Sequence, residues 1–452
     1  MSGSAALTAA AGFAALADPI GVAAQSAGVK PADLPDLTIK EVKVYVTDLG
    51  SYHSLNGEKG ELVSIVTNSG IEGNYTLGNR NPTPNWLEWA KPNLVGKSVM
   101  EVLPTLTSTS GLRGTYGFNG VLPSPQGSNG PRWQGGNTFH RATAKALGSA
   151  FDSDLVGGGL MTHAGGNWPN WYSAAADVCL WDILGKAVNR PIYKILGGTK
   201  NKVLAYASSQ HLANVEDYGP DILKAKAAGI KAYKIHPGGG QHKTGGRIPS
   251  YLGHIDEIKE VRQAVGDDFT LLFDGVQTYN YYEALRVGRA LDEYGYDSFE
   301  DPMQTTDLEG LIELRKHLDV PTEVGEFLTN IYDYGEYIKR DAMGIVRLVT
   351  DGVGGITGSF RVGQLADTFG MPCTPHNWGT FFDMAAAFQV ELALPNCYWF
   401  EMVWPWEYAD RPYVKYQFRV DADGYVAAPT DPGMGYPLDM AVVDKLTTRI
   451  DR

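Results

Sequence analysis

Six ionisable residues recur at nearly equal spacing in the second half of this 452-residue chain. Successive members are 26, 26, 25, 25 and 25 residues apart, and the series is Asp274, Glu300, Glu326, Asp351, His376 and Glu401. Each member lies at or near the end of a short apolar segment typical of a β-strand, and amphipathic helical patterns fit between the segments. This repeat of one strand and one helix predicts a parallel sheet.

The predicted strands of this region share an apolar character. They cover residues 203–208, 230–236, 270–274, 298–301, 321–326, 345–351 and 371–376. Helical patterns between them include residues 281–295, 305–318 and 356–370. About seven or eight such units favour a closed TIM-type barrel over an open sheet, which would need a reversal point and a nucleotide-binding loop that the sequence lacks.

The first part of the chain has a different pattern. Residues 39–48 and 62–67 predict an antiparallel hairpin, and helical patterns appear at 139–151 and 171–188. Residues 1–38 are rich in Ala, Gly and Ser, and they lack the positive start of a secretory signal, so we expect an N-terminal extension.

Composition excludes several classes of partner. The net charge of −13 is spread along the chain and disfavours nucleic acid, and no apolar run is long enough to cross a membrane. Cys179, Cys373 and Cys397 have no metal-type spacing, so we expect a reducing, cytoplasmic compartment. The expected partner is a small molecule.

The carboxylates near the strand ends predict a metal site. TIM-type barrels keep their active sites at the carboxyl ends of the strands, where Asp274, Glu300 and Glu326 would meet. Such carboxylates repel one another unless a cation joins them, and hard oxygen ligands suit Mg²⁺, with Mn²⁺ as a substitute. Asp351 and His376 come from the next two strands, and a carboxylate beside an imidazole favours acid–base chemistry.

A second polar pair ends the segment KAYKIH at residues 231–236. Residues i and i+2 of a strand share a face, so Lys234 and His236 are both predicted to point into the barrel. A lysine there supplies a positive charge for a substrate anion, and an imidazole suits proton transfer near neutral pH. The alternative for His236 is a purely structural hydrogen bond to a neighbouring carboxylate.

Several motifs together resemble the enolase superfamily, in its mandelate racemase and muconate lactonizing enzyme branch. They are AAADVCLWDILGKAVNRPIYKILGG at 174–198, FEDP at 299–302, VGE at 324–326, DGVGGIT at 351–357 and PHNWG at 375–379. The resemblance implies a (β/α)7β barrel under an α+β capping domain built from the N-terminal lobe and the C-terminal tail. We accordingly expect residues 39–200 to form the capping domain, 201–403 the barrel, and 404–452 a tail that packs on the capping domain.

The same resemblance implies a reaction in which a divalent metal stabilises the enediolate formed when the proton next to a carboxylate is removed. It implies metal ligands at Asp274, Glu300 and Glu326, a catalytic dyad of Asp351 and His376, and an acid, Glu401, that hydrogen-bonds the substrate carboxylate. The sequence departs from the family pattern twice. Asp274-Gly275-Val276 replaces Asp-x-Asn, and Lys234-Ile235-His236 replaces Lys-x-Lys.

These features lead us to expect a Mg²⁺-dependent dehydratase that converts a sugar acid, an aldonate or aldarate, to a 2-keto-3-deoxy acid. A racemase, epimerase or cycloisomerase of a related acid is the alternative. Two other classes stay open, a Schiff-base lyase that uses Lys234 and a barrel that only binds a sugar acid. Substrate contacts are expected from Tyr52, His53, Arg113 and Trp133, and a homo-oligomer is expected by analogy with the family.

Overall fold

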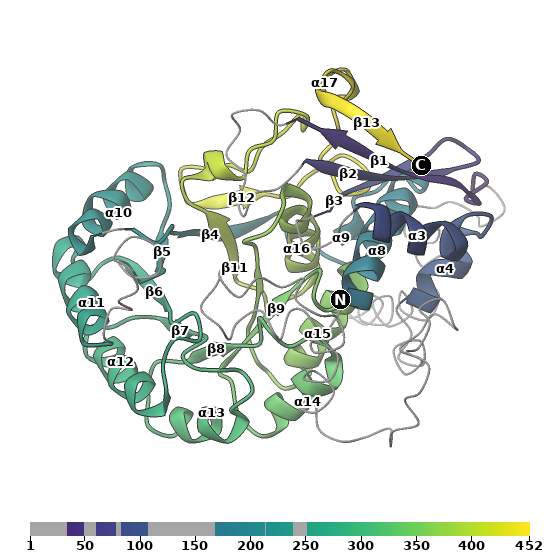
Figure 1. The fold of residues 1–452 in the computed structure, drawn as a ribbon. Helices are drawn as coiled ribbons and strands as arrows, with labels where there is room; N and C mark the ends of the chain where they lie inside the picture. Colours follow the sequence, from purple (N-terminus) through teal and green to yellow (C-terminus); the bar gives the residue numbers. More distant parts are fainter. Residues whose placement is uncertain (1–33, 49–59, 78–82, 107–167, 213, 238–250) are drawn as a thin grey trace, which may run out of the picture.

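The computed structural model describes residues 34–48, 60–77, 83–106, 168–212, 214–237 and 251–452, which form two sheets and their helices (Figure 1). The smaller sheet is antiparallel in the order β13-β1-β2-β3. Its strands are β1 (Ile39–Thr47), β2 (Glu61–Thr67), β3 (Glu72–Leu77) and β13 (Thr447–Asp451). The predicted hairpin of residues 39–48 and 62–67 is therefore confirmed, with Val44 opposite Val63.

Four described helices accompany this sheet, and the first and third of them make the main contacts with its strands. They are α3 (Thr83–Leu94), α4 (Val99–Leu106), α8 (Trp168–Ala187) and α9 (Ile192–Ile195). Helix α8 is the predicted helix of residues 171–188, and it is buried along nearly its whole described length because β3 and α15 pack on different sides of it.

The larger sheet is curled into a ring, with helices on its outer surface (Figure 1). Its path is β10-β9-β8-β7-β6-β5-β4-β11, and every pair along this path is parallel. The strands are β4 (Lys202–Ser208), β5 (Ala232–Ile235), β6 (Thr270–Asp274), β7 (Ser298–Glu300), β8 (Thr322–Val324), β9 (Ile345–Val349), β10 (Cys373–His376) and β11 (Trp399–Val403).

In the described residues one α-helix follows each of the first seven barrel strands, and the first of these helices is preceded by the short 3-10 helix η4 (Val215–Asp217). These helices are α10 (Tyr218–Ala227), α11 (Tyr251–Val265), α12 (Tyr281–Glu293), α13 (Leu308–Arg315), α14 (Ile331–Lys339), α15 (Ile356–Thr368) and α16 (Phe381–Ala393). Side-chain caps explain where several of them begin; Asn280, for example, accepts a hydrogen bond from the main chain of Glu283 at the start of α12. The predicted fold class, an α/β barrel with a capping domain, is confirmed.

The C-terminal segment contacts both sheets. It contains the short helices η5 (Trp406–Tyr408) and α17 (Met440–Leu446) and the strand β12 (Tyr425–Ala427). Strand β12 pairs with β4 of the barrel, whereas β13 pairs with β1 of the capping sheet. This segment therefore links the barrel to β1, the first strand that the structure describes.

Two aspartates join α8 to its neighbours, one to the barrel and the other to the capping sheet and the C-terminal segment. Asp177 accepts hydrogen bonds from the main-chain nitrogen (3.1 Å) and the hydroxyl (2.7 Å) of Thr357, at the start of α15. Asp182 accepts from the main-chain nitrogens of Asn74 on β3 (3.0 Å) and Met434 in the C-terminal segment (2.9 Å). The AAADVCLWDILG motif thus sets how the capping elements sit against the barrel.

In the part of the chain that the structure describes, no helix is both long and apolar enough to span a membrane.

Candidate active site

The six evenly spaced ionisable residues lie at different depths in the barrel, although their spacing predicted that all of them would lie at one rim. The last residues of β6, β7 and β10 are Asp274, Glu300 and His376, as predicted. Glu326 and Asp351 come two residues after β8 and β9, whereas Glu401 lies in the middle of β11. The prediction of a strand-end position is therefore wrong for Glu401, because chain spacing fixes the length of each unit and not the depth at which its strand crosses the barrel.

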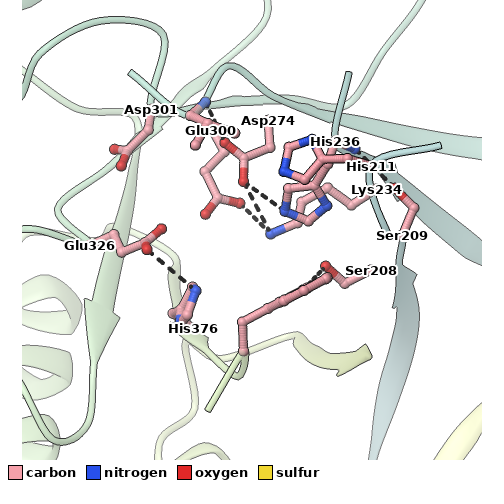
Figure 2. Close-up of polar contacts among 12 residues, drawn as sticks. Ser208, Ser209, His211, Lys234, His236, Asp274, Glu300, Asp301, Glu326 and His376 are labelled. Carbon is pink, nitrogen blue, oxygen red and sulfur yellow. Dashed lines mark hydrogen bonds and ion pairs between the residues drawn. The ribbon is translucent and has the colours of Figure 1, made fainter. Parts of the chain in front are cut away.

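Lys234 lies at the centre of the site and is completely buried (Figure 2). Its Nζ is 2.6 Å from Glu300 Oε2, 2.5 Å from Glu401 Oε1 and 3.8 Å from Asp274 Oδ2. Burial and the charge of Arg347 act to lower the pKa of Lys234, but the attraction of Glu300 and Glu401 outweighs them and raises it. Lys234 is therefore a permanent cation, and it points into the barrel as predicted.

Arg347 on β9 is a second buried cation that the sequence reasoning missed. Its Nε is 2.8 Å from Glu300 Oε1, and its Nη2 is 2.5 Å from Glu401 Oε2. Its Nη1 donates to the hydroxyl of Tyr206 on β4 (3.0 Å). One signal could have revealed it, since a lone arginine in the apolar strand IVRLV must face a polar interior.

Both carboxylate oxygens of Glu401 contact more than one donor. Besides the two cations, its Oε1 accepts from the Ser208 hydroxyl (2.8 Å) and its Oε2 from the main-chain nitrogen of Asn377 (2.7 Å). Burial acts to raise the pKa of Glu401, but the charges of Arg347 and Lys234 hold it well below its usual range. The structure therefore describes an ionised acceptor, whereas donating to a substrate carboxylate, as the family resemblance implies, needs a protonated acid.

Two imidazoles flank the carboxylates, each beside an acidic partner (Figure 2). His236 Nε2 is 3.1 Å from Asp274 Oδ2, and His376 Nε2 is 3.3 Å from Glu326 Oε1. Burial is the main influence on His376 and lowers its pKa to about 3, so this imidazole is neutral at neutral pH. The histidines follow or end β5 and β10, which are not neighbours in the barrel, so they approach its mouth from separate sides.

The ring of His236 is held by its neighbours. Its centroid lies 5.2 Å from that of His211 and 5.0 Å from that of Trp378, whose ring meets it edge-on. The indole nitrogen of Trp378 donates to Ser208 Oγ (2.6 Å), which in turn donates to Glu401. His236 Nδ1 is buried and has no hydrogen-bond partner among the residues that the structure describes, so this nitrogen is available for a further ligand.

The loop after β6 contains an amide side chain one position beyond the place where the family pattern has Asn. Gln277, one position beyond Val276, donates from Nε2 to Asp301 Oδ2 (3.4 Å) and to Thr305 Oγ1 (2.7 Å). Both Val276 and Gln277 have positive φ, at 46° and 55°. The loop is thus wound tightly enough to turn the amide toward Asp301. Burial and the charges of Glu300 and Asp274 raise the pKa of Asp301 well above its usual value.

The charge balance of the site fits a divalent cation. When ionised, Asp274, Glu300, Glu326 and Glu401 carry four negative charges, which Lys234 and Arg347 offset only by half. Burial is the largest cause that raises the pKa of Glu326 well above its usual value, and the nearby carboxylates Asp301, Glu300 and Asp274 add to it.

The donor atoms also suit Mg²⁺. Glu300 Oε1 is buried and, despite its ion pair with Arg347, accepts no hydrogen bond of good geometry from the described part of the chain. In the described residues, however, no three His, Cys, Asp or Glu side chains are already drawn together as an ion cage. The predicted ligands Asp274, Glu300 and Glu326 therefore fit the cation by the chemistry of their oxygens and by their charge, although their side chains are not yet gathered around one point.

Comparison with known proteins identifies the family. Residues 221–442 match the family model described as enolase C-terminal domain-like. Arabinonate dehydratase of Saccharolobus solfataricus is 30% identical over 274 residues, which cover 60% of this chain and 71% of that protein. The chain belongs to the enolase superfamily.

Two further likenesses extend the comparison for this enolase-superfamily chain. D-galactarolactone cycloisomerase of Agrobacterium fabrum is 28% identical over 275 residues, covering 58% of this chain and 70% of that protein. The solved structure of D-glucarate dehydratase from Agrobacterium tumefaciens, complexed with magnesium, aligns with a TM-score of 0.70 at 25% identity. The alignment covers 92% of this chain and 100% of that one. The relatives thus include both dehydratases and a cycloisomerase.

Some predicted residues of this superfamily member are not tested by the structure. Tyr52, His53, Arg113 and Trp133 lie outside the described residues, as does the predicted helix at 139–151. Asp351 lies just after β9, and its partnership with His376 stays a prediction.

Proposed function

We propose that the protein is a Mg²⁺-dependent dehydratase of a sugar acid. The observation that carries the proposal is the pair of imidazoles, each within about 3.3 Å of a carboxylate, one directly after β5 and the other at the end of the non-adjacent β10. Elimination of water needs one group to remove the proton next to the carboxylate and another to protonate the departing hydroxyl. Two separate histidines supply such groups.

The roles follow from the surroundings of each ring. His376 is the base, since it is neutral and ends a strand on the side of the barrel away from His236, and Asp351, two residues after the neighbouring β9, orients it. His236 is the acid that protonates the leaving hydroxyl. Lys234 supplies a fixed positive charge beside the substrate anion. Glu401 contributes a fixed negative charge in place of the proton donor that the family resemblance implies.

Magnesium, when bound, would stabilise negative charge on the substrate carboxylate. The chain's own part is to hold that ion with Asp274, Glu300 and Glu326. Arabinonate dehydratase and D-glucarate dehydratase are similar to this chain, and their names support elimination from a sugar acid. The similarity to D-galactarolactone cycloisomerase keeps a cycloisomerase as the second candidate, because two acid–base groups also serve that reaction.

A Schiff-base lyase fits the site less well. The nucleophile of such an enzyme is a neutral amine, whereas Lys234 is an ion-paired cation with a raised pKa. Borohydride treatment in the presence of substrate would leave a covalent adduct on Lys234 if the lyase were the correct class. We expect no adduct.

The test is a panel of aldonates and aldarates incubated with Mg²⁺, with 2-keto-3-deoxy acids as the detected product. Each active substrate is then repeated after EDTA treatment and after Mg²⁺ is restored. We expect turnover of at least one acid, lost with EDTA and recovered with Mg²⁺. Turnover that is indifferent to EDTA would contradict the metal assignment, and isomerised product without loss of water would favour the cycloisomerase.

A further inference from the structure

Four buried side chains at the barrel centre form a closed ring of alternating charge. Glu300 and Glu401 are each joined to both cations, to Lys234 through one carboxylate oxygen and to Arg347 through the other. The distances around the ring are 2.6, 2.5, 2.5 and 2.8 Å. The side chains of all four are 0% exposed.

The geometry of Arg347 makes it the hardest member to replace. Its Nε lies against Glu300, whereas its Nη2 donates to Glu401, so one planar group joins the two acids. Its Nη1 meanwhile donates to Tyr206 and lies 3.4 Å from Glu323, on two further strands. A lysine keeps the charge but presents a single compact ammonium, which lacks this rigid fork.

We propose that Arg347 is a positioning residue that holds Glu300 in place as a metal ligand and anchors Glu401 as a permanent anion. This inference rests on the proposed function, in which Glu300 binds Mg²⁺. The contact between Arg347 Nε and Glu300 Oε1 is an ion pair without a well-aligned hydrogen bond, so the oxygen is held near its place yet keeps an acceptor site free. Partners that orient a metal ligand in this way usually change metal affinity when they are replaced.

The alternative is that Arg347 matters only as one positive charge. Arg347→Lys separates the two accounts, since it preserves the charge and removes the fork. Arg262→Lys is the matched control, because Arg262 is also buried but donates to the main-chain carbonyls of Gly266, Phe269, Tyr294 and Gly295.

The measurement is Mn²⁺ binding to the whole protein, followed by electron paramagnetic resonance and checked with Mg²⁺ by calorimetry. We expect Arg347→Lys to weaken binding by about 10- to 100-fold and Arg262→Lys to change it by less than about twofold. Binding by Arg347→Lys within about twofold of the unaltered protein would overturn the positioning role.

A second pair of variants covers the case in which Arg347→Lys does not fold. Arg347→Met leaves a buried excess negative charge, and the double variant Arg347→Met/Glu401→Gln restores neutrality. We expect the double variant to unfold at a higher urea concentration than Arg347→Met, yet to bind Mn²⁺ at least about tenfold more weakly than Glu401→Gln alone. A double variant no more stable than Arg347→Met, or one that binds Mn²⁺ as Glu401→Gln does, would overturn the inference.

Failure of the proposed function gives a different pattern. If the unaltered protein bound neither Mn²⁺ nor Mg²⁺, the assignment of Glu300 as a metal ligand would be wrong. A double variant more stable than Arg347→Met would still support the conclusion that Arg347 anchors Glu401.

Discussion

Replacing Asp177 by asparagine should change how the stability of this protein depends on pH. Asp177 is fully buried on α8 and accepts two hydrogen bonds from Thr357 at the start of α15. Burial has the largest effect on this carboxyl and raises its pKa from 3.8 to about 7, although the bonds to Thr357 act in the opposite direction. Between these two pH values the folded protein holds a proton that the unfolded chain has released.

The magnitude follows from the two pKa values. A folded state that binds one extra proton loses about 1.4 kcal/mol of stability for each unit that the pH rises. From pH 4 to 7 the total is about 4 kcal/mol, fully present below the unfolded pKa and lost as the pH rises through about 7. Asparagine mimics the protonated carboxyl and cannot ionise, so Asp177→Asn should gain about 4 kcal/mol relative to the unaltered protein across this interval.

Urea denaturation at several pH values between 4.5 and 8 measures this difference. Asp367→Asn is a control of the same chemistry, on the exposed side of α15. The free energies of unfolding of Asp177→Asn and of the unaltered protein should diverge with rising pH, in favour of the variant. Two curves that stay parallel would refute the reasoning, because they would mean that Asp177 has the same pKa in both states.

Three other substitutions probe the supports of the site. Gly355→Ala should lower the free energy of unfolding by about 2 kcal/mol or more, since Gly355 has φ 89° and an added Cβ would lie 2.4 Å from Asp177 Oδ2; an unchanged urea midpoint would contradict this. Asp182→Ala leaves two main-chain N–H groups on other segments without their acceptor, so the free energy of unfolding should fall by about 2–4 kcal/mol in the same urea assay. A loss below about 0.5 kcal/mol would contradict this, because it would show that water replaces the carboxylate. Trp378→Phe keeps a ring beside His236 but removes the hydrogen bond to Ser208, so kcat should fall about five- to tenfold while the fold stays intact. An unaltered kcat would exclude a catalytic role for this hydrogen bond.

The barrel could be predicted because its pattern is local. Each strand and helix carries its own apolar period, and Asp274, Glu300 and His376 end their strands as the sequence indicates. Strands β3 and β13 were missed for a physical reason, since they are short and polar and are stabilised by pairing with β2 and β1, and their own local pattern does not specify that pairing.

The connections between side chains could be predicted only in part. The shared face of Lys234 and His236 follows from strand geometry, and both reach Asp274. The ion pairs of Arg347 with Glu300 and Glu401 depend on the depth and register of three separate strands, and residue spacing does not determine either. A lone arginine in an apolar strand was nevertheless a visible sign.

The most direct test of the central claim follows the proton next to the substrate carboxylate by NMR in D₂O, using an acid found active in the panel and Mg²⁺. The unaltered protein, His376→Asn and His236→Asn are compared, with the surface variant His317→Asn as the control. We expect His376→Asn to lose both exchange and elimination, His236→Asn to keep exchange but lose elimination, and the control to lose neither. Elimination that proceeds undiminished in both site variants would contradict this expectation.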